Sequence, residues 1–333
     1  MARPLSRFAP LAAACALLLT APAGADVPEA VAKSLPGFHA FAEASAALAD
    51  AAAADCSVAA LEAPWSAAYD AWMGVAHLRL GPSEQGGRAV AIAFWPDPKA
   101  VGARQQLAAL EATDPALLEP GALAHAAVGN RGLLALKRLM FGEMASEAPY
   151  ACALRRAIAA DLAGMATALE AEWAPYADLL LSAGAEGNTT FLAPEEARQA
   201  LFTMLVKGLE FNADQRIGRP LGSFDTPRPD RAEALPAPRA RANVGLSLAA
   251  LERLARALAQ GLGEIPATEA AFARARAQAD WPEDPAFAAV EDPAGRLKVE
   301  ILQQSILLTR DAALAELGTL LGVSAGFNAG DGD

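Results

Sequence analysis

The sequence predicts an all-α protein built from two helical bundles. The 333-residue chain is rich in Ala and Leu, and aromatic residues make up only 6% of it. Such a composition favours helices over strands. In several segments the apolar residues recur every three or four positions, so each segment presents one apolar stripe to a core. We therefore expect the helices to pack through these stripes as bundles.

The first 25 residues have the layout of a cleavable secretory signal. Arg3 and Arg7 precede an apolar run, and Ala23-Gly24-Ala25 has the small-residue pattern of a cleavage site. The apolar run is too short to cross a bilayer, and no later stretch is long enough to do so. We therefore expect residues 1–25 to be removed and the mature protein to be periplasmic, with no transmembrane segment.

The net charge restricts the classes of partner. The whole chain carries a formal charge of −12, and loss of the two signal-peptide arginines would make the mature form more negative still. Nucleic acids and anionic membranes are therefore poor partners on electrostatic grounds.

Two cysteines, Cys56 and Cys152, remain after removal of the signal. An even number of cysteines in an oxidising compartment favours a disulfide between them. The alternative is two buried free thiols, because a bond requires the two Cα atoms to lie within about 7 Å.

Turn signals and stripes divide the chain into successive helices. A polar, glycine-containing stretch over residues 182–190 marks a boundary between domains 26–185 and 186–333. We expect a loop over 83–98, and the proline-rich segment 216–238 is either a flexible linker or a packed functional loop. The expected helices are 31–55, one from Pro64 to the Gly81-Pro82 corner, 99–110, 123–144, 150–173, 194–214, 242–261, 267–279 and 296–321.

The segment from Asn130 to Gly142 looks like a metal-site motif whose ligands have been replaced. Leu134 and Lys137 lie one turn apart, which is the spacing that a two-ligand site on a helix would use. A leucine offers no donor atom and a lysine ammonium repels a cation. With Arg131 and Arg138 beside it, Lys137 favours an anionic or neutral ligand over a metal ion.

Short segments along nearly the whole mature chain together carry a family resemblance through their order and spacing. They are Leu35-Pro36-Gly37, Trp72 with Arg79-x-Gly81-Pro82, Phe94-Trp95-Pro96-Asp97, Arg131-Gly132 with Leu139-Met140-Phe141-Gly142, Asp214-Gln215 with Pro220-Leu221-Gly222, Ala232-Glu233, and Gly326-Phe327-Asn328 with Asp331-Gly332-Asp333.

In this arrangement the chain resembles the imelysin-like family of exported bacterial proteins, classed with peptidase M75 and related to the periplasmic component of a ferrous-iron uptake system. The resemblance implies two helical bundles with a ligand site in the groove between them. The family signature G-x-H-x-x-E falls on Gly132, Leu134 and Lys137, so this divergent member lacks both signature ligands.

The candidate ligand-binding residues are those on which the resemblance depends. Charged residues held between two bundles either fix the domain interface or bind a polar ligand. Trp95 and Asp97 either line a pocket or plug the end of a bundle. The set is Arg79, Trp95, Asp97, Arg131, Lys137, Asp214, Arg216 and Glu233.

Two further groups have alternative interpretations. His39 and Glu43 lie four residues apart on one helix face, where they would either form a solvated ion pair or hold a metal with a third ligand. Iron, zinc and calcium are the candidate metals. Asp70, His77 and Arg79 form either a structural cluster or part of a ligand site.

Three functions remain open. The first is an exported binding or accessory protein, linked to iron uptake, whose partner is a small ligand or a periplasmic iron-uptake component and which performs no hydrolysis. The alternatives are a metal-dependent peptidase of the M75 type, acting through a site such as His39 and Glu43, and a cell-surface interaction scaffold. We assign no catalytic residue, because the sequence contains no nucleophile elbow, H-E-x-x-H, phosphate loop or Cys-x-x-Cys.

Overall fold

The computed structural model describes residues 26–323, and these are organised almost wholly by helices. The expected signal peptide and the terminal motif at 326–333 lie outside the described residues. Between residues 26 and 323 there is no strand, only an isolated bridge between Ser223 and Thr226. The prediction of an all-α fold is confirmed. None of the helices in this range is long and apolar enough to span a membrane.

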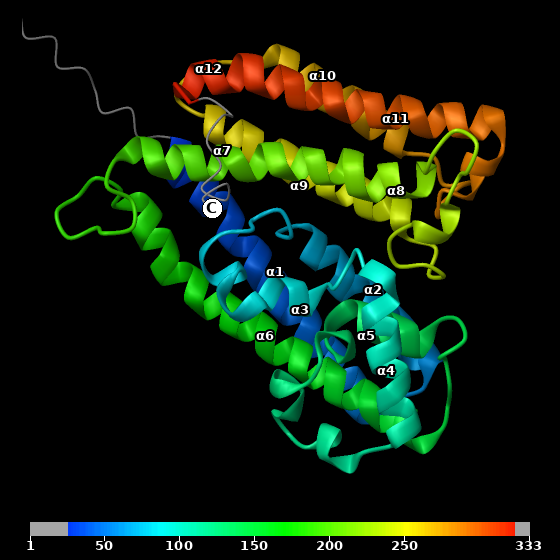
Figure 1. Ribbon diagram of the computed structural model, residues 1–333. Coiled ribbons are helices and arrows are strands. Elements are labelled where there is room, and N and C mark those ends of the chain that lie inside the picture. Colours follow the sequence, from blue (N-terminus) through cyan, green and yellow to red (C-terminus); the bar gives the residue numbers. More distant parts are fainter. Residues whose placement is uncertain (1–25, 324–333) are drawn as a thin grey trace, which may run out of the picture.

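The N-terminal half, α1 to α6, forms the lower part of Figure 1. Its first helix packs against α2 and α6, and it also contacts α7 and α9 of the other half. The rings of Phe38 and Trp173 stack with centroids 4.5 Å apart, which joins the first helix to the sixth. The helices are α1 (Asp26–Ala54), α2 (Val58–Met73), α3 (Arg88–Ile92), α4 (Val101–Ala112), α5 (Gly132–Met140) and α6 (Pro149–Leu181).

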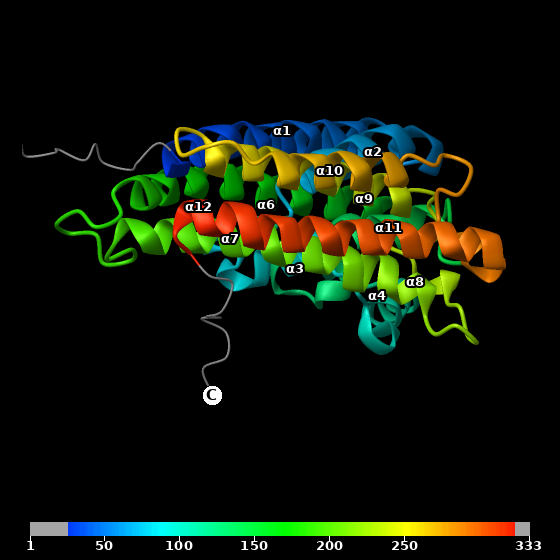
Figure 2. The same cartoon turned by 90° about the horizontal axis from the view of Figure 1, so that it is seen from above.

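The C-terminal half, α7 to α12, forms the upper part of Figure 1, and Figure 2 shows its helices running side by side along the molecule. Neighbouring pairs are α7 with α9, α9 with α10, and α10 with α11. Two stretches are π-helical, η7 (Phe211–Ile217) and η10 (Ala313–Leu317). The α-helices are α7 (Pro194–Glu210), α8 (Gly218–Leu221), α9 (Ala240–Ala259), α10 (Pro266–Ala279), α11 (Pro293–Ala312) and α12 (Gly318–Leu321).

One continuous apolar core runs through both halves. Buried side chains from α1, α2 and α6 belong to the same cluster as those from α7, α9 and α11. The first helix lies at the centre of this arrangement because it touches both halves. The division into domains 26–185 and 186–333 stays a prediction.

Three sequence-based expectations about individual elements were wrong. The helix expected over 123–144 is restricted to Gly132–Met140. Gly132 has a φ of 70°, and a Cβ atom there would lie 2.2 Å from the carbonyl oxygen of Ala91, so this backbone approaches α3 too closely for a continuous helix. The expected loop over 83–98 contains α3, and the segment expected to be irregular from residue 216 remains helical through Leu221.

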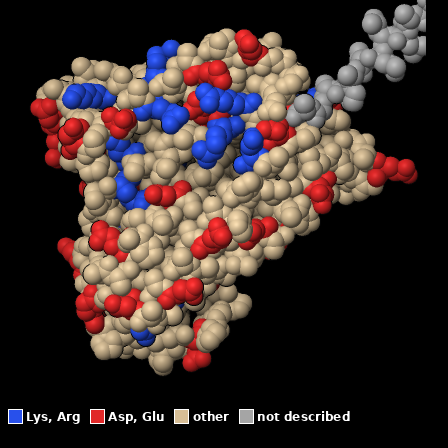
Figure 3. Space-filling model, turned by 180° about the vertical axis from the view of Figure 1, so that it is seen from behind, with Lys and Arg blue, Asp and Glu red and all other residues tan. Residues whose placement is uncertain are grey.

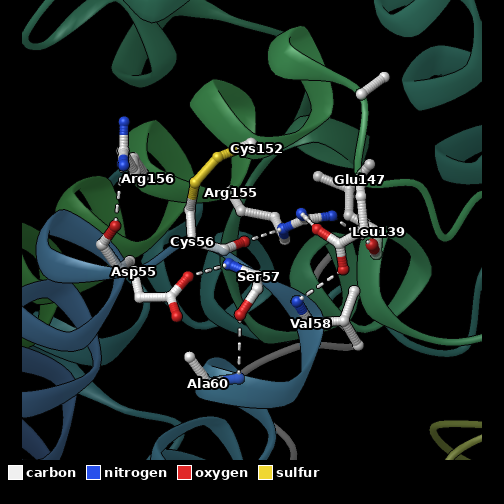
Figure 4. Close-up of a disulfide and its surroundings, with 12 residues drawn as sticks. Asp55, Cys56, Ser57, Val58, Ala60, Leu139, Glu147, Cys152, Arg155 and Arg156 are labelled. Carbon is white, nitrogen blue, oxygen red and sulfur yellow. Dashed lines mark hydrogen bonds and ion pairs between the residues drawn. A yellow bond between two sulfur atoms is a disulfide. The ribbon is translucent and has the colours of Figure 1, made fainter.

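The disulfide prediction is confirmed. Cys56 and Cys152 are bonded, with Cα atoms 5.3 Å apart, and they join the turn between α1 and α2 to the start of α6 (Figure 4). Beside them the fully buried guanidinium of Arg155 donates to the carbonyl oxygen of Cys56 at 2.7 Å and to Glu147 at 2.8 Å. The bond and the arginine hold the same junction between helices.

Candidate functional site

A cavity of about 330 Å³ lies between the two halves of the molecule. The end of α2, the turns after it and α3 form one wall, and α7, η7 and α9 form the other. The polar and aromatic residues that line it are Trp72, His77, Arg79, Trp95, Lys207, Glu210, Phe211, Asp214, Gln215, Arg216, Glu233 and Ser247. We call it the groove cavity.

The π-helix η7 supplies much of the second wall. Its wider turn follows α7 without a break and ends at α8. It buries Asn212 and Arg216 while leaving Asp214 exposed. Single π-helical turns of this kind occur frequently at functional sites.

A buried hydrogen-bond network is centred on Glu233. Arg216 Nε donates to Glu233 Oε2 at 2.9 Å, and their side chains are only 8% and 4% exposed. Asn243 Nδ2 donates to the same oxygen at 2.8 Å, and the Tyr69 hydroxyl donates to Oε1 at 3.3 Å. Burial, with the charge of Glu233 nearby, raises the pKa of Tyr69 well above its usual value, so this hydroxyl stays protonated.

Arg216 retains one incompletely used donor group. Its Nη1 atom contacts Asn212 Oδ1 at 3.1 Å and Ser247 Oγ at 3.4 Å. Among residues 26–323, its Nη2 atom has only the sulfur of Met73, at 3.7 Å, as a partner. A thioether is a weak acceptor, so this NH₂ group can still donate to an oxygen.

Aromatic rings form the apolar part of the cavity. The rings of Trp95 and Phe211 meet edge to face with centroids 5.9 Å apart. Arg216 lies 4.9 Å from the centre of Phe211, and Arg219 lies 5.9 Å from that of Trp95. These cation–π contacts hold the two rings in place in the cavity wall.

The charged residues at the mouth differ in whether they are paired. Lys207 pairs with Glu210 at 3.1 Å, and Arg79 pairs with Glu84. Asp214 is exposed and has no hydrogen bond or ion pair to any residue that the structure describes. It is therefore the carboxylate of the cavity that remains available to a ligand.

His77 lies in the cavity wall as a neutral imidazole. Its Nδ1 atom is enclosed and has no hydrogen-bond partner within residues 26–323. Burial, together with the nearby charges of Arg253 and Arg216, lowers its pKa to about 3. The ring is uncharged at neutral pH and offers an unused nitrogen.

Comparison with known proteins agrees with this architecture. The family model described as imelysin, Peptidase_M75, matches residues 34–312. The chain belongs to the imelysin family. Its fold is similar to that of an imelysin-like protein from Psychrobacter arcticum 273-4, with a TM-score of 0.74 at 20% identity, over 91% of this chain and 98% of that one. The search of curated proteins finds no match.

In this imelysin-family chain, five of the eight predicted ligand residues line the groove cavity. These are Arg79, Trp95, Asp214, Arg216 and Glu233. They come from both halves of the molecule, and the sequence alone gave no means of separating them from the other three. Their role in ligand binding stays a prediction.

The other three lie elsewhere. Both carboxylate oxygens of Asp97 accept backbone N–H groups at the start of α4, at 2.9 and 3.0 Å, so this residue caps a helix. Arg131 makes two hydrogen bonds to Asp161, at 2.8 and 2.9 Å. Lys137 Nζ donates to the carbonyl oxygen of Leu235 at 2.5 Å, and burial lowers its pKa to about 8.

The three cations of the segment from Asn130 to Gly142 are each held by a different partner. Arg138 donates to Gln106 Oε1 and to the carbonyl oxygen of Gly129, both at 2.6 Å. With Arg131 bound to Asp161 and Lys137 bound to Leu235, each of the three has a separate partner. Leu134 is buried in the core.

His39 and Glu43 lie on the exposed face of α1. Their Nε2 and Oε1 atoms are 3.4 Å apart, and His39 Nδ1 also contacts Glu170 Oε1 at 2.7 Å. The hydrogen bond to Glu170, then the charge of Glu43, raises the pKa of His39. Within residues 26–323, no three His, Cys, Asp or Glu side chains converge in the manner of metal ligands. Metal binding by this pair stays a prediction.

Sequence reasoning missed several residues of the cavity. Lys207, Glu210 and Phe211 carry no motif, and their helical spacing predicts only an ordinary amphipathic helix. Ser247 on α9 gave no signal either. For Glu210 and Phe211, the one available indication was that they lie close to Asp214 in the sequence.

Proposed function

We propose that the protein is an exported binding or accessory protein that holds a small ligand in the groove cavity and does not hydrolyse it. The observation that carries this proposal is the set of unused polar groups around an aromatic wall. Among residues 26–323, Arg216 Nη2 has only a sulfur partner and the Asp214 carboxylate is unpaired. A ligand that gives these groups hydrogen-bond partners is stabilised in the cavity.

The geometry favours a ligand with distinct ends. A neutral or anionic acceptor group would meet Arg216 Nη2, and a donor or cationic group would meet Asp214. The middle of the ligand, between these two ends, would be flat and apolar and would pack against the rings of Trp95 and Phe211. A cavity of about 330 Å³ suits a small molecule rather than a protein partner.

The absence of hydrolysis in this proposal is supported by the signature segment. At the two positions where the family signature has ligands, Leu134 is buried in the core and Lys137 is bonded to a backbone carbonyl. Export is supported by the disulfide, since such bonds persist in oxidising compartments. The link to iron uptake rests on the family relationship alone.

The proposal is tested first by native mass spectrometry of the protein purified from the periplasm. We expect a co-purifying small molecule that is lost from Trp95→Ala and weakened in Asp214→Asn. Trp281→Ala is the matched control, because Trp281 also contacts cations, Arg241 and Lys298, but does not line the cavity. Retention of the molecule by Trp95→Ala, or its equal loss from Trp281→Ala, would contradict the proposed site.

The second arm addresses chemistry. Elemental analysis and a peptidase assay with and without chelator distinguish a binding protein from a metal-dependent enzyme. We expect no chelator-sensitive cleavage. Activity that a chelator abolishes and Glu43→Ala removes would favour the peptidase alternative instead.

A further inference from the structure

A second cavity, of about 240 Å³, lies where α1, the end of α2 and α9 meet. Its charged lining residues are Lys33 and Arg253, and no carboxylate lines it. His77 belongs to its wall as well as to the wall of the groove cavity. We call it the rear cavity.

Arg253 differs from its neighbours in having no partner. Within the described part of the chain, its guanidinium makes no ion pair or hydrogen bond. Arg256, three residues further along α9, contacts Glu252 at 2.7 Å and Glu269 at 2.9 Å. Figure 3 shows Lys and Arg side chains gathered on the upper part of the rear face, where the C-terminal half lies, with acidic side chains among them.

Lys33 supplies a second charge that is only loosely held. Its ammonium lies 3.3 Å from Glu29 in the same helix, and its side chain is mostly exposed. Exposed pairs of this type contribute little to stability, so the ammonium can exchange Glu29 for another partner. The flexible stem allows the ammonium to turn toward the rear cavity.

His77 provides an independent indication of a ligand. Its enclosed Nδ1 atom has no hydrogen-bond partner among residues 26–323. The imidazole lies close enough to Arg253 and Arg216 to feel both positive charges. An anion between His77 and Arg253 would satisfy the nitrogen and offset the repulsion at the same time.

We propose that the rear cavity binds a small oxyanion, a phosphate, sulfate or carboxylate group of a soluble molecule. Arg253 donates its planar pair of N–H groups to two oxygens of the anion. Lys33 adds a second charge, and His77 donates from Nδ1 when its proton resides there. This site is separate from the groove cavity and does not depend on the proposed function.

The shared imidazole gives the site a further consequence. His77 forms part of both cavities, so an anion at the rear acts on a residue that also faces the groove. An anion bound in the rear cavity would therefore change the environment of a side chain that also lines the groove cavity.

The test uses isothermal titration calorimetry of the mature chain in low-salt buffer. Inorganic phosphate, sulfate and citrate are titrated separately, which distinguishes a preference for tetrahedral anions from one for carboxylates. We expect one saturable site for at least one of them. Arg253→Ala should weaken binding at least about tenfold, whereas Arg256→Ala should leave it within about twofold.

Histidine NMR provides a second measurement, because the ring signal of His77 would not respond to anions if this residue had only a structural role. The ring signal of His77, assigned with His77→Gln, should shift with the bound anion, while those of His39 and His125 stay in place. If Arg253→Ala does not fold, Arg253→Lys and Lys33→Ala replace it and should each weaken binding. No saturable binding by tens of millimolar anion, equal weakening by Arg256→Ala, or an unmoved His77 signal would each overturn the proposal.

Discussion

Replacement of Glu233 by methionine should lower the free energy of unfolding by about 3–5 kcal/mol, because it leaves a buried arginine without its counter-charge. The change removes the acceptor of Arg216 Nε at 2.9 Å, of Asn243 Nδ2 at 2.8 Å and of the Tyr69 hydroxyl at 3.3 Å. A hydrogen bond to a charged group contributes about 1.5–3 kcal/mol and a neutral one about 1 kcal/mol.

The double variant Arg216→Met, Glu233→Met should recover much of this loss, because it removes the uncompensated charge and fills the space with apolar atoms. We would measure urea unfolding by circular dichroism at neutral pH for the wild type, both single variants and the double. Glu84→Met is the control, since it removes an exposed ion pair with Arg79 at the same cavity and should cost less than about 1 kcal/mol.

Two results would refute this reasoning. If Glu233→Met costs no more than Glu84→Met, the network does not hold the cavity wall together. If the losses of the two single variants simply add in the double, Arg216 and Glu233 do not interact energetically in the folded protein. Either result would leave the two side chains positioned by their helices alone.

Three more predictions concern stability. The Cys56–Cys152 bond closes a loop with a sequence separation of 96, so Cys56→Ser, Cys152→Ser should lose up to about 4–5 kcal/mol in urea unfolding, and a reductant should affect the wild type but not the variant. Lys137 has a folded-state pKa of about 8, below its unfolded value, so its burial cost is fully present below pH 8 and is relieved as pH rises toward 10.5. The wild type should therefore gain stability relative to Lys137→Met over this range, by at most about 3 kcal/mol, and a flat difference in urea unfolding would refute the shift. Gly132→Ala should cost more than about 2 kcal/mol in thermal unfolding, because a Cβ would meet Ala91 and Ile92 carbonyl oxygens at 2.2 and 2.3 Å, whereas Gly164→Ala, with open space around it, should be neutral or stabilising.

The helices were predictable because their apolar spacing is local information. The stripe of Leu154, Ile158, Leu162 and Trp173 predicts α6 from the sequence alone, and all four residues are buried. The break before Gly132 was not predictable, because it depends on the backbone of α3 forty residues away. A long-range steric contact leaves no periodic signal in the sequence.

The site was predictable only in part for the same reason. The pairing of Arg131 with Asp161, and that of Arg216 with Glu233, is decided by how distant segments pack. The sequence did not indicate that Asp97 serves as a helix cap while Asp214 lines a cavity. Partners separated by many residues can be assigned only from the three-dimensional arrangement.

The number of residues in the π-helix η7 decides which of its side chains face the groove cavity. A π-turn is equivalent to one extra residue inserted into an α-helix. Deleting a single residue from Phe211–Ile217 should let α-helical hydrogen bonding resume there, with the helix beyond it kept in place and the side chains of the former π-helical stretch turned in new directions. The arginine that meets Glu233 would then face another direction although no functional side chain had been substituted. Among related chains, a one-residue gap at this point would separate those that keep the groove network from those that have lost it.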